Sequence, residues 1–160
     1  MGSLVETLSF NGNRLTELMH FYTLHELKKM HCLFILPLKK IFHEKTAVIG
    51  NGQKGSFDFL VETVSGKEIG IEVLTRPSKG KMKQKLSYSK NVDEFIFVIP
   101  EHFLENYKIH EKKGFKGAVK KHFLPKEFSS QKLFAWIFDT EKRAFTTKAS
   151  FSGVFNTAKA

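Results

Sequence analysis

Residues 55–88 carry the sequence GSFDFLVETVSGKEIGIEVLTRPSKGKMKQKLSY, in which polar residues interrupt runs that otherwise have the composition of buried strands. Residues 56–61 and 69–74 are rich in apolar, aromatic and β-branched side chains, which favour strands. Between them, Ser65-Gly66-Lys67 has the composition of a tight turn. The stretch therefore predicts a β-hairpin.

This hairpin carries one notable acidic residue on each strand. Because side chains alternate between the faces of a strand, Phe57, Phe59 and Val61 are expected to share one face. Asp58 is then expected on the other face, and Glu72 follows it by 14 residues on the second strand. A register that pairs the two acids would bring like charges together, which favours a bound cation, and oxygen ligands suit Mg²⁺ or Mn²⁺. The alternative is an ordinary antiparallel ribbon with one solvated face.

The residues after the hairpin predict a helix and then a further strand. Pro77 and Ser78 can end the second strand and begin a helix. On such a helix Gln84 and Tyr88 are four positions apart and would lie on one face. Residues 92–99 then have the composition of another buried strand.

Together these segments resemble the PD-(D/E)XK nuclease superfamily, most closely its RecB-like branch, with a pattern of GxxD, an acid about fourteen residues later, and QxxxY. Here the pattern is Gly55-Ser56-Phe57-Asp58, Glu72 and Gln84-Lys85-Leu86-Ser87-Tyr88, and the resemblance covers about residues 13–100. It implies an α/β (α+β) fold with a restriction-endonuclease-like αβββαβ core, whose central mixed sheet is flanked by helices. It also implies Asp58, Glu72 and the carbonyl of Val73 as ligands of Mg²⁺ or Mn²⁺, with Gln84 and Tyr88 holding the phosphate or ordering the site.

One position departs from this pattern. The family's catalytic lysine stands two residues after the second acid, where this chain has Leu74. A leucine cannot offset charge on a phosphorane-like transition state, so another cation is required for catalysis. Arg76 is one possibility, but arginine stays protonated at any ordinary pH and is a poor proton carrier. We therefore expect a lysine of the following helix to substitute, from among Lys81, Lys83 and Lys85.

A helix is expected upstream, with Asn13 as its cap. In the resembled family an acid on this first helix often approaches the metal, which makes Glu17 and Glu26 candidate ligands. The seven histidines show neither HExxH nor a Cys/His zinc spacing. His25 and His31 lie near Glu26 in the sequence and could assist the site, but exposed or capping histidines are the simpler expectation.

The charge balance favours a nucleic-acid partner. The formal net charge is +10, and the 15 residues from Arg76 to Lys90 include six basic residues and no acidic one. Such runs attract a polyanion, although they can also be simple solvated surface. The candidate DNA-binding residues are Arg76, Lys79, Lys112, Lys113, Lys116, Lys120 and Lys121.

The 160-residue chain is expected to form a single nuclease-like domain, with a core at about 13–100, a C-terminal extension at 101–147 and a tail at 148–160. Residues 133–138 and a second strand through Phe145 predict a C-terminal hairpin, and the stretch from Thr146 onward is expected to be loosely held. The single Cys32 lies in an apolar run and is expected to be a buried thiol. With neither a signal-peptide pattern nor a membrane-spanning run, we expect a soluble, intracellular (cytoplasmic) protein.

The sequence therefore predicts a Mg²⁺- or Mn²⁺-dependent DNA endonuclease or exonuclease, which could act as a homodimer. Because the lysine position holds Leu74, the alternative is a domain of the same fold that binds nucleic acid or a protein partner without cleavage. A third alternative is a basic structural or assembly protein in which the motif matches are chance.

Overall fold

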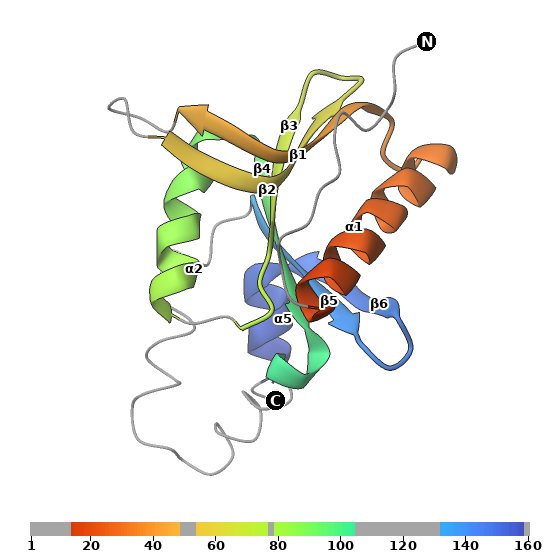
Figure 1. Ribbon diagram of the computed structural model, residues 1–160, viewed down its shortest axis with the longest axis vertical. Coiled ribbons are helices and arrows are strands. Elements are labelled where there is room, and N and C mark those ends of the chain that lie inside the picture. The colour runs from red at the N-terminus through yellow and green to blue at the C-terminus, as the bar shows by residue number, and fades with distance from the viewer. Residues whose placement is uncertain (1–13, 49–53, 77–78, 105–131, 159–160) are drawn as a thin grey trace.

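The computed structural model describes residues 14–48, 54–76, 79–104 and 132–158. Within these ranges it shows a six-stranded mixed sheet with helices on both faces (Figure 1). The elements follow one another as α1 (Arg14–Cys32), β1 (Leu38–Val48), β2 (Lys54–Thr63), β3 (Glu68–Val73), α2 (Lys79–Leu86), the 3₁₀ helix η1 (Ser87–Asn91), β4 (Glu94–Pro100), β5 (Leu133–Asp139), β6 (Ala144–Ser150) and α5 (Phe151–Ala158).

The strands lie in the sheet in the same order as in the sequence. The pairs β1–β2, β2–β3 and β5–β6 are antiparallel, whereas β3–β4 and β4–β5 are parallel. The predicted succession of helix, three strands, helix and strand is therefore confirmed, and the predicted C-terminal hairpin extends the sheet beyond β4. No helix among the described residues is long and apolar enough to cross a membrane.

The hairpin predicted from residues 55–74 is confirmed in detail. Phe59 pairs with Ile71 and Leu60 with Gly70, while the turn is closed by the Gly66 N–H, which donates to the Thr63 carbonyl at 3.0 Å. Gly66 has a φ of 90°, a conformation that residues with a Cβ rarely adopt. A glycine at this point of the sequence thus fixes the turn and the register of the two acid-bearing strands.

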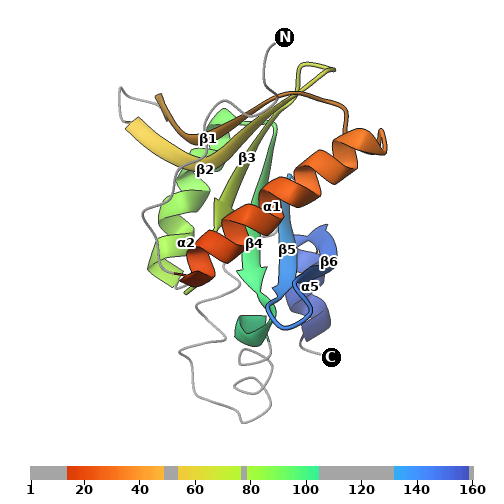
Figure 2. The same cartoon turned by 45° about the vertical axis from the view of Figure 1, so that its right-hand side comes forward.

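Helix α1 covers one face of the sheet, and α2 and α5 cover the other (Figure 2). The buried residues of α1 recur at helical spacing and include Met19, Leu24 and Leu27. They pack against alternate residues of β2 and β3, which are Phe59, Val61, Ile71 and Val73. The opposite cluster includes Met82, Phe95, Phe97, Ile137, Phe151 and Val154. Because the central strands are covered on both faces, β3 and β4 are buried along almost their whole length.

Phe57 does not share a face with Phe59 and Val61, so that prediction is wrong. Its ring packs with Phe95 on the α2 side, and it lies so close to Gly70 that a Cβ there would meet the ring at 2.8 Å. On the neighbouring strand, Glu44 has a φ of 56°, between the pairs His43↔Phe59 and Lys45↔Phe57. This local distortion of the β1–β2 ribbon breaks the strict alternation on which the prediction relied.

Two further predictions fail. Cys32 is exposed at the end of α1 rather than buried, because the apolar residues after it form an exposed turn instead of a core segment. The expected loose tail is also wrong, since β6 continues to Ser150 and α5 follows it directly. Phe151 and Val154 of α5 are buried, so apolar residues spaced by three anchor this helix to the core.

Candidate active site

The two predicted carboxylates meet where β2 separates from β3. The last paired residues are Phe59 and Ile71, so the next positions along the strands are Asp58 and Glu72. Asp58 Oδ2 accepts a hydrogen bond of 2.8 Å from the N–H of Val73, replacing the strand pairing that ends here. Asp58 also hydrogen-bonds with the Glu72 side chain, so the structure has the register that the sequence had left open.

The two acids have different environments. The Asp58 side chain is 27% exposed, whereas Glu72 is almost fully buried. Burial, followed by the negative charge of Asp58 and a hydrogen bond with it, raises the pKa of Glu72 to about 9. Lys85 acts in the opposite direction but does not outweigh burial. Without a bound cation, Glu72 therefore carries a proton at neutral pH.

Lys85 of α2 is the candidate lysine that lies beside the carboxylates. Its Nζ lies 3.4 Å from Glu72 Oε1, and its side chain is 22% exposed. The ammonium group also lies 5.2 Å from the centre of the Tyr88 ring. Lys81 of the same helix is exposed, and the side chain of Lys83 lies outside the described part of the structure. Of the three candidate lysines, the structure brings Lys85 to the carboxylates.

Leu74, at the family's lysine position, is a core residue. Its side chain is buried in the same apolar cluster as Met82 of α2. A lysine at this position would have to place its stem in this cluster.

Gln84 and Tyr88 do not lie on one continuous α-helix, because α2 ends at Leu86 and Tyr88 belongs to η1. Tyr88 packs edge-on against Phe57 at 6.0 Å between ring centres, beside Lys85. Gln84 is exposed, and its backbone carbonyl accepts a hydrogen bond from the Ser87 hydroxyl. Tyr88 therefore lies at the edge of the site, with its ring serving as a wall for Lys85.

On α1, a histidine lies beside the carboxylate pair. Glu26 forms an ion pair with Lys148 of β6, and Glu17 is exposed. The α1 residue beside Asp58 is His20, whose Nε2 lies 4.0 Å from Asp58 Oδ2. Glu26 is therefore paired with β6, whereas Glu17 stays a candidate ligand one helical turn before His20.

His20 belongs to a buried pair of histidines that sequence reasoning missed. Its Nδ1 lies 3.0 Å from Nε2 of His43 on β1, within hydrogen-bonding distance. Burial lowers the pKa of both rings, which favours their neutral forms. The available signal was weak: His20 lies within the inward-facing stripe of α1, but nothing in the sequence links it to His43. His31, by contrast, accepts a hydrogen bond of 2.9 Å from the N–H of Leu38 and so ties the end of α1 to the start of β1.

The site has the donors that a divalent cation requires. Glu72 Oε1 is buried, with the Lys85 ammonium 3.4 Å away, and Asp58 lies beside Glu72. In a strand, the N–H and C=O of one residue point toward the same neighbour, so the Val73 carbonyl faces the Asp58 side. Within the described ranges, no three His, Cys, Asp or Glu side chains form a metal cluster. A cation here would therefore be held by two carboxylates, a backbone oxygen and water, which is a set that suits Mg²⁺ or Mn²⁺.

The predicted DNA-binding residues are only partly described. Arg76 is exposed just beyond β3, and the backbone of Lys79 lies at the start of α2. The lysines of the second basic run lie outside the described residues: Lys112, Lys113, Lys116, Lys120 and Lys121.

The chain matches no family model, no curated protein and no solved structure. Its candidate site is therefore defined by Asp58, Glu72, Lys85 and His20, whose distances from one another are given above.

Proposed function

We propose that this protein is a divalent-metal-dependent nuclease with a restriction-endonuclease-like fold, which hydrolyses phosphodiester bonds of DNA. The observation that carries the proposal is the position of Lys85, whose Nζ lies 3.4 Å from the buried Glu72 carboxylate. An acid pair and a lysine are the side chains that metal-assisted hydrolysis of a phosphodiester needs. The acid pair and Lys85 lie together here, although Lys85 comes from α2 and the sequence pattern has its lysine on the strand of Glu72.

The topology supports the same proposal. A helix precedes three antiparallel strands, and a second helix leads to a strand parallel to the third. This is the αβββαβ order implied by the resemblance, with Asp58 and Glu72 on the second and third strands and Lys85 on the second helix.

Each residue of the site would have a distinct role in hydrolysis. Asp58, Glu72 and the carbonyl of Val73 would hold Mg²⁺ or Mn²⁺, which supplies a Lewis acid for the phosphate and an acidified water. The hydrogen bond from the Val73 N–H keeps Asp58 turned toward Glu72. The ammonium of Lys85 would then offset negative charge on the transition state, while Tyr88 limits its movement. His20 would maintain the orientation of Asp58 from the other side.

The net charge of +10 supports a polyanionic substrate. One observation also favours the second candidate, a DNA-binding or protein-binding domain of the same fold without catalysis. Glu72 is 1% exposed and its pKa is raised to about 9, so a metal must displace its proton before binding. If that displacement is too costly, the fold serves recognition alone.

A cleavage assay separates the two candidates. Wild-type protein and Glu72→Ala are incubated with linear, circular and branched DNA in Mg²⁺ or Mn²⁺, and strand scission is followed on denaturing gels. We expect wild-type protein to cut, and Glu72→Ala to lose cutting by about 10²-fold or more, because one of two metal-binding carboxylates is gone. Intact DNA in all reactions with retained DNA binding would establish the recognition domain instead.

A further inference from the structure

A cluster of exposed apolar side chains lies at the end of α1 remote from His20. Leu33, Phe34 and Ile35 are 58%, 84% and 65% exposed, and Val64 of the β2–β3 turn is 68% exposed. We call these four residues the apolar tip. Of the five large apolar side chains found exposed in the described structure, four belong to the tip and the fifth is Phe21 on α1. Such a concentration marks an interaction site more often than scattered single residues do.

The backbone conformation at the tip shows that the exposed aromatic side chain there does not stabilise the fold. The N–H of Ile35 donates to the carbonyl of Met30 at 3.0 Å, and that of Phe34 to the carbonyl of His31 at 3.1 Å. These two bonds form a Schellman helix end, in which Phe34 occupies the left-handed position with a φ of 56°. Glycine is the usual residue there, and a bulky aromatic is unfavourable. An exposed phenylalanine at this position is therefore a cost to folding with no compensating burial.

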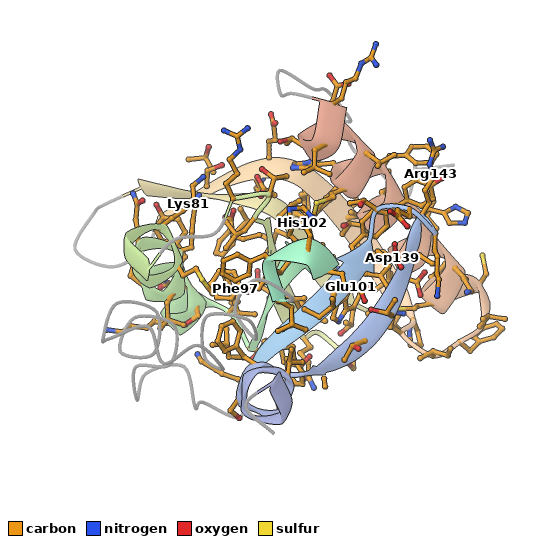
Figure 3. All side chains as sticks on the ribbon, turned by 90° about the horizontal axis from the view of Figure 1, so that it is seen from below. Lys81, Phe97, Glu101, His102, Asp139 and Arg143 are labelled. Carbon is orange, nitrogen blue, oxygen red and sulfur yellow. The ribbon has the colours of Figure 1, made fainter. Side chains whose placement is uncertain are left out.

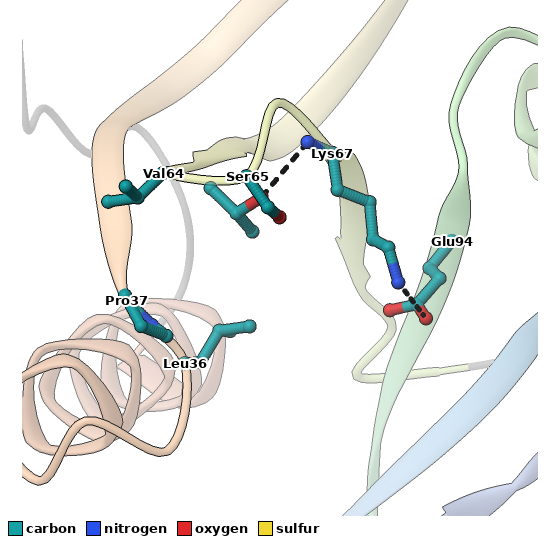
Figure 4. Close-up of a pocket in the computed structure, with 7 residues that line it drawn as sticks. Leu36, Pro37, Val64, Ser65, Lys67 and Glu94 are labelled. Carbon is teal, nitrogen blue, oxygen red and sulfur yellow. Dashed lines mark hydrogen bonds and ion pairs between the residues drawn. The ribbon is translucent and has the colours of Figure 1, made fainter.

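The tip is held in place by the neighbouring hairpin. The N–H of Val64 donates to the carbonyl of Pro37 at 3.0 Å, which joins the two turns. A cavity of about 420 Å³ lies between them, with Leu36, Pro37 and Val64 on its apolar side (Figure 4). The ion pair of Lys67 and Glu94, 3.3 Å apart, borders its polar side. The tip is thus a fixed apolar projection.

The solvent-facing side of α1, opposite the buried His20, extends along the helix to the tip. At successive turns it exposes Arg14, Glu17, Phe21, His25 and Lys28, of which only Glu17 is acidic. The rings of Phe21 and His25 stack with an interplanar angle of 8°. Basic groups interleaved with aromatic rings are typical of surfaces that follow a nucleic-acid strand.

A groove beside α1 continues this basic character. It has a volume of about 250 Å³, and Lys29 of α1 and Arg143 of the β5–β6 turn line it together with Tyr22, His25, Glu26, Ala144 and Phe145. Figure 3 shows Arg143 projecting from that turn. The groove therefore combines basic groups from two elements, and its one acidic residue, Glu26, is paired with Lys148.

We propose that the exposed side of α1 and the apolar tip bind the DNA substrate, with Phe34 stacking on a base exposed where a duplex meets a single strand. Apolar side chains such as Phe, Leu and Ile are those that proteins insert against base steps. This surface would add a second contact to the substrate of the proposed nuclease. It rests on the proposed function only for the statement that DNA also binds at Asp58. A partner that contacts both the basic side of α1 and the tip must be elongated and anionic, which DNA is.

The length of α1 sets a distance for this arrangement. Fourteen residues separate His20 from Phe34, which corresponds to about 20 Å along a helix. At about 3.4 Å per nucleotide of one strand, the stacked base lies about six nucleotides from the phosphate at the candidate site. Scission should therefore occur at that distance from the junction.

Equilibrium binding in EDTA tests the inference without requiring catalysis. Fluorescence anisotropy compares a dumbbell duplex closed at both ends with a duplex of the same sequence that carries one single-stranded arm. We expect wild-type protein to prefer the junction by about tenfold, the size of one base stacked on an aromatic ring. Phe34→Gly should abolish this preference, and Phe34→Trp should retain it.

The variants also exclude a trivial loss of folding. Phe34→Gly should melt at or above the wild-type temperature, because glycine suits the left-handed position. Lys28→Ala should weaken binding to both DNAs equally and reduce its salt dependence. A junction preference that persists in Phe34→Gly would overturn the inference while leaving nuclease activity intact as a proposal. Conversely, a Phe34-dependent preference without any scission would retain the inference and refute the nuclease.

Two other outcomes would also overturn it. Phe34-dependent binding to vesicles of anionic phospholipid, without a junction preference, would make the tip a membrane contact. A dimer in solution that Phe34→Gly converts to monomer, again without a junction preference, would make it an interface between two copies of the chain.

Discussion

Replacement of Lys85 by methionine is expected to reduce the rate of metal-dependent strand scission by about 10²- to 10³-fold, the usual effect of removing one group that stabilises transition-state charge. Methionine retains the apolar length of the lysine stem, so packing against Tyr88 is preserved while the ammonium beside Glu72 is removed. Single-turnover cleavage at saturating protein isolates this chemical effect from binding.

The matched control is Lys28→Met, which removes an exposed lysine of α1 remote from Glu72. It should leave the single-turnover rate at saturation near the wild-type value, although DNA affinity falls. Lys85→Arg should recover only part of the rate, because a guanidinium retains the charge but not the geometry or proton chemistry of an amine. If Lys85→Met cleaves as fast as wild-type protein, Lys85 is not the substitute for the missing strand lysine.

Replacement of Glu72 by glutamine is expected to raise the free energy of unfolding of the metal-free protein by about 3–5 kcal/mol at pH 8. Burial and Asp58 raise the pKa of Glu72 from 4.5 to about 9 in the folded state. The folded protein therefore holds a proton that the unfolded chain releases. The stability that this protonation provides is complete below pH 4.5 and is lost progressively as the pH rises toward about 9.

Chemical denaturation in EDTA at several pH values measures this difference. Between pH 5 and 9 the wild-type free energy of unfolding should fall by up to about 1.4 kcal/mol per pH unit on account of this group. Glu72→Gln removes that dependence, and at pH 4 the two proteins should be nearly equal in stability. Glu62→Gln, on the same hairpin but only half-buried, serves as control and should leave the pH dependence in place. A Glu72→Gln variant that is less stable than wild type at pH 8 would contradict the neutral, buried state of this carboxyl.

Local sequence was sufficient for the hairpin and its acids. Gly66 determines the turn and alternation determines most of the faces, whereas the register that brings Asp58 beside Glu72 stayed open until the structure showed the strand pairing. The face on which Phe57 lies was predicted wrongly because the distortion at Glu44 is on the neighbouring strand, and the sequence does not reveal how that strand pairs. Likewise, the exposure of Cys32 depends on how α1 ends, which the apolar run after it obscured.

The cation and the histidine pair could not be predicted for a related reason. The choice among Lys81, Lys83 and Lys85 depends on where α2 changes to a 3₁₀ helix and on its rotation against the sheet. His20 and His43 are 23 residues apart on different elements, and no short motif connects them. Tertiary packing, rather than local propensity, determines both contacts.

The most direct test of the carboxylate pair as a metal site is isothermal titration of the protein with Mn²⁺ at pH 8, in two buffers of different ionisation enthalpy. Binding should release about one proton, because Glu72 must ionise to act as a ligand. Both the binding heat and the proton release should disappear in Asp58→Asn and in Glu72→Gln. Absence of Mn²⁺ binding in wild-type protein, or unchanged binding in both variants, would contradict a metal-dependent nuclease site at Asp58 and Glu72.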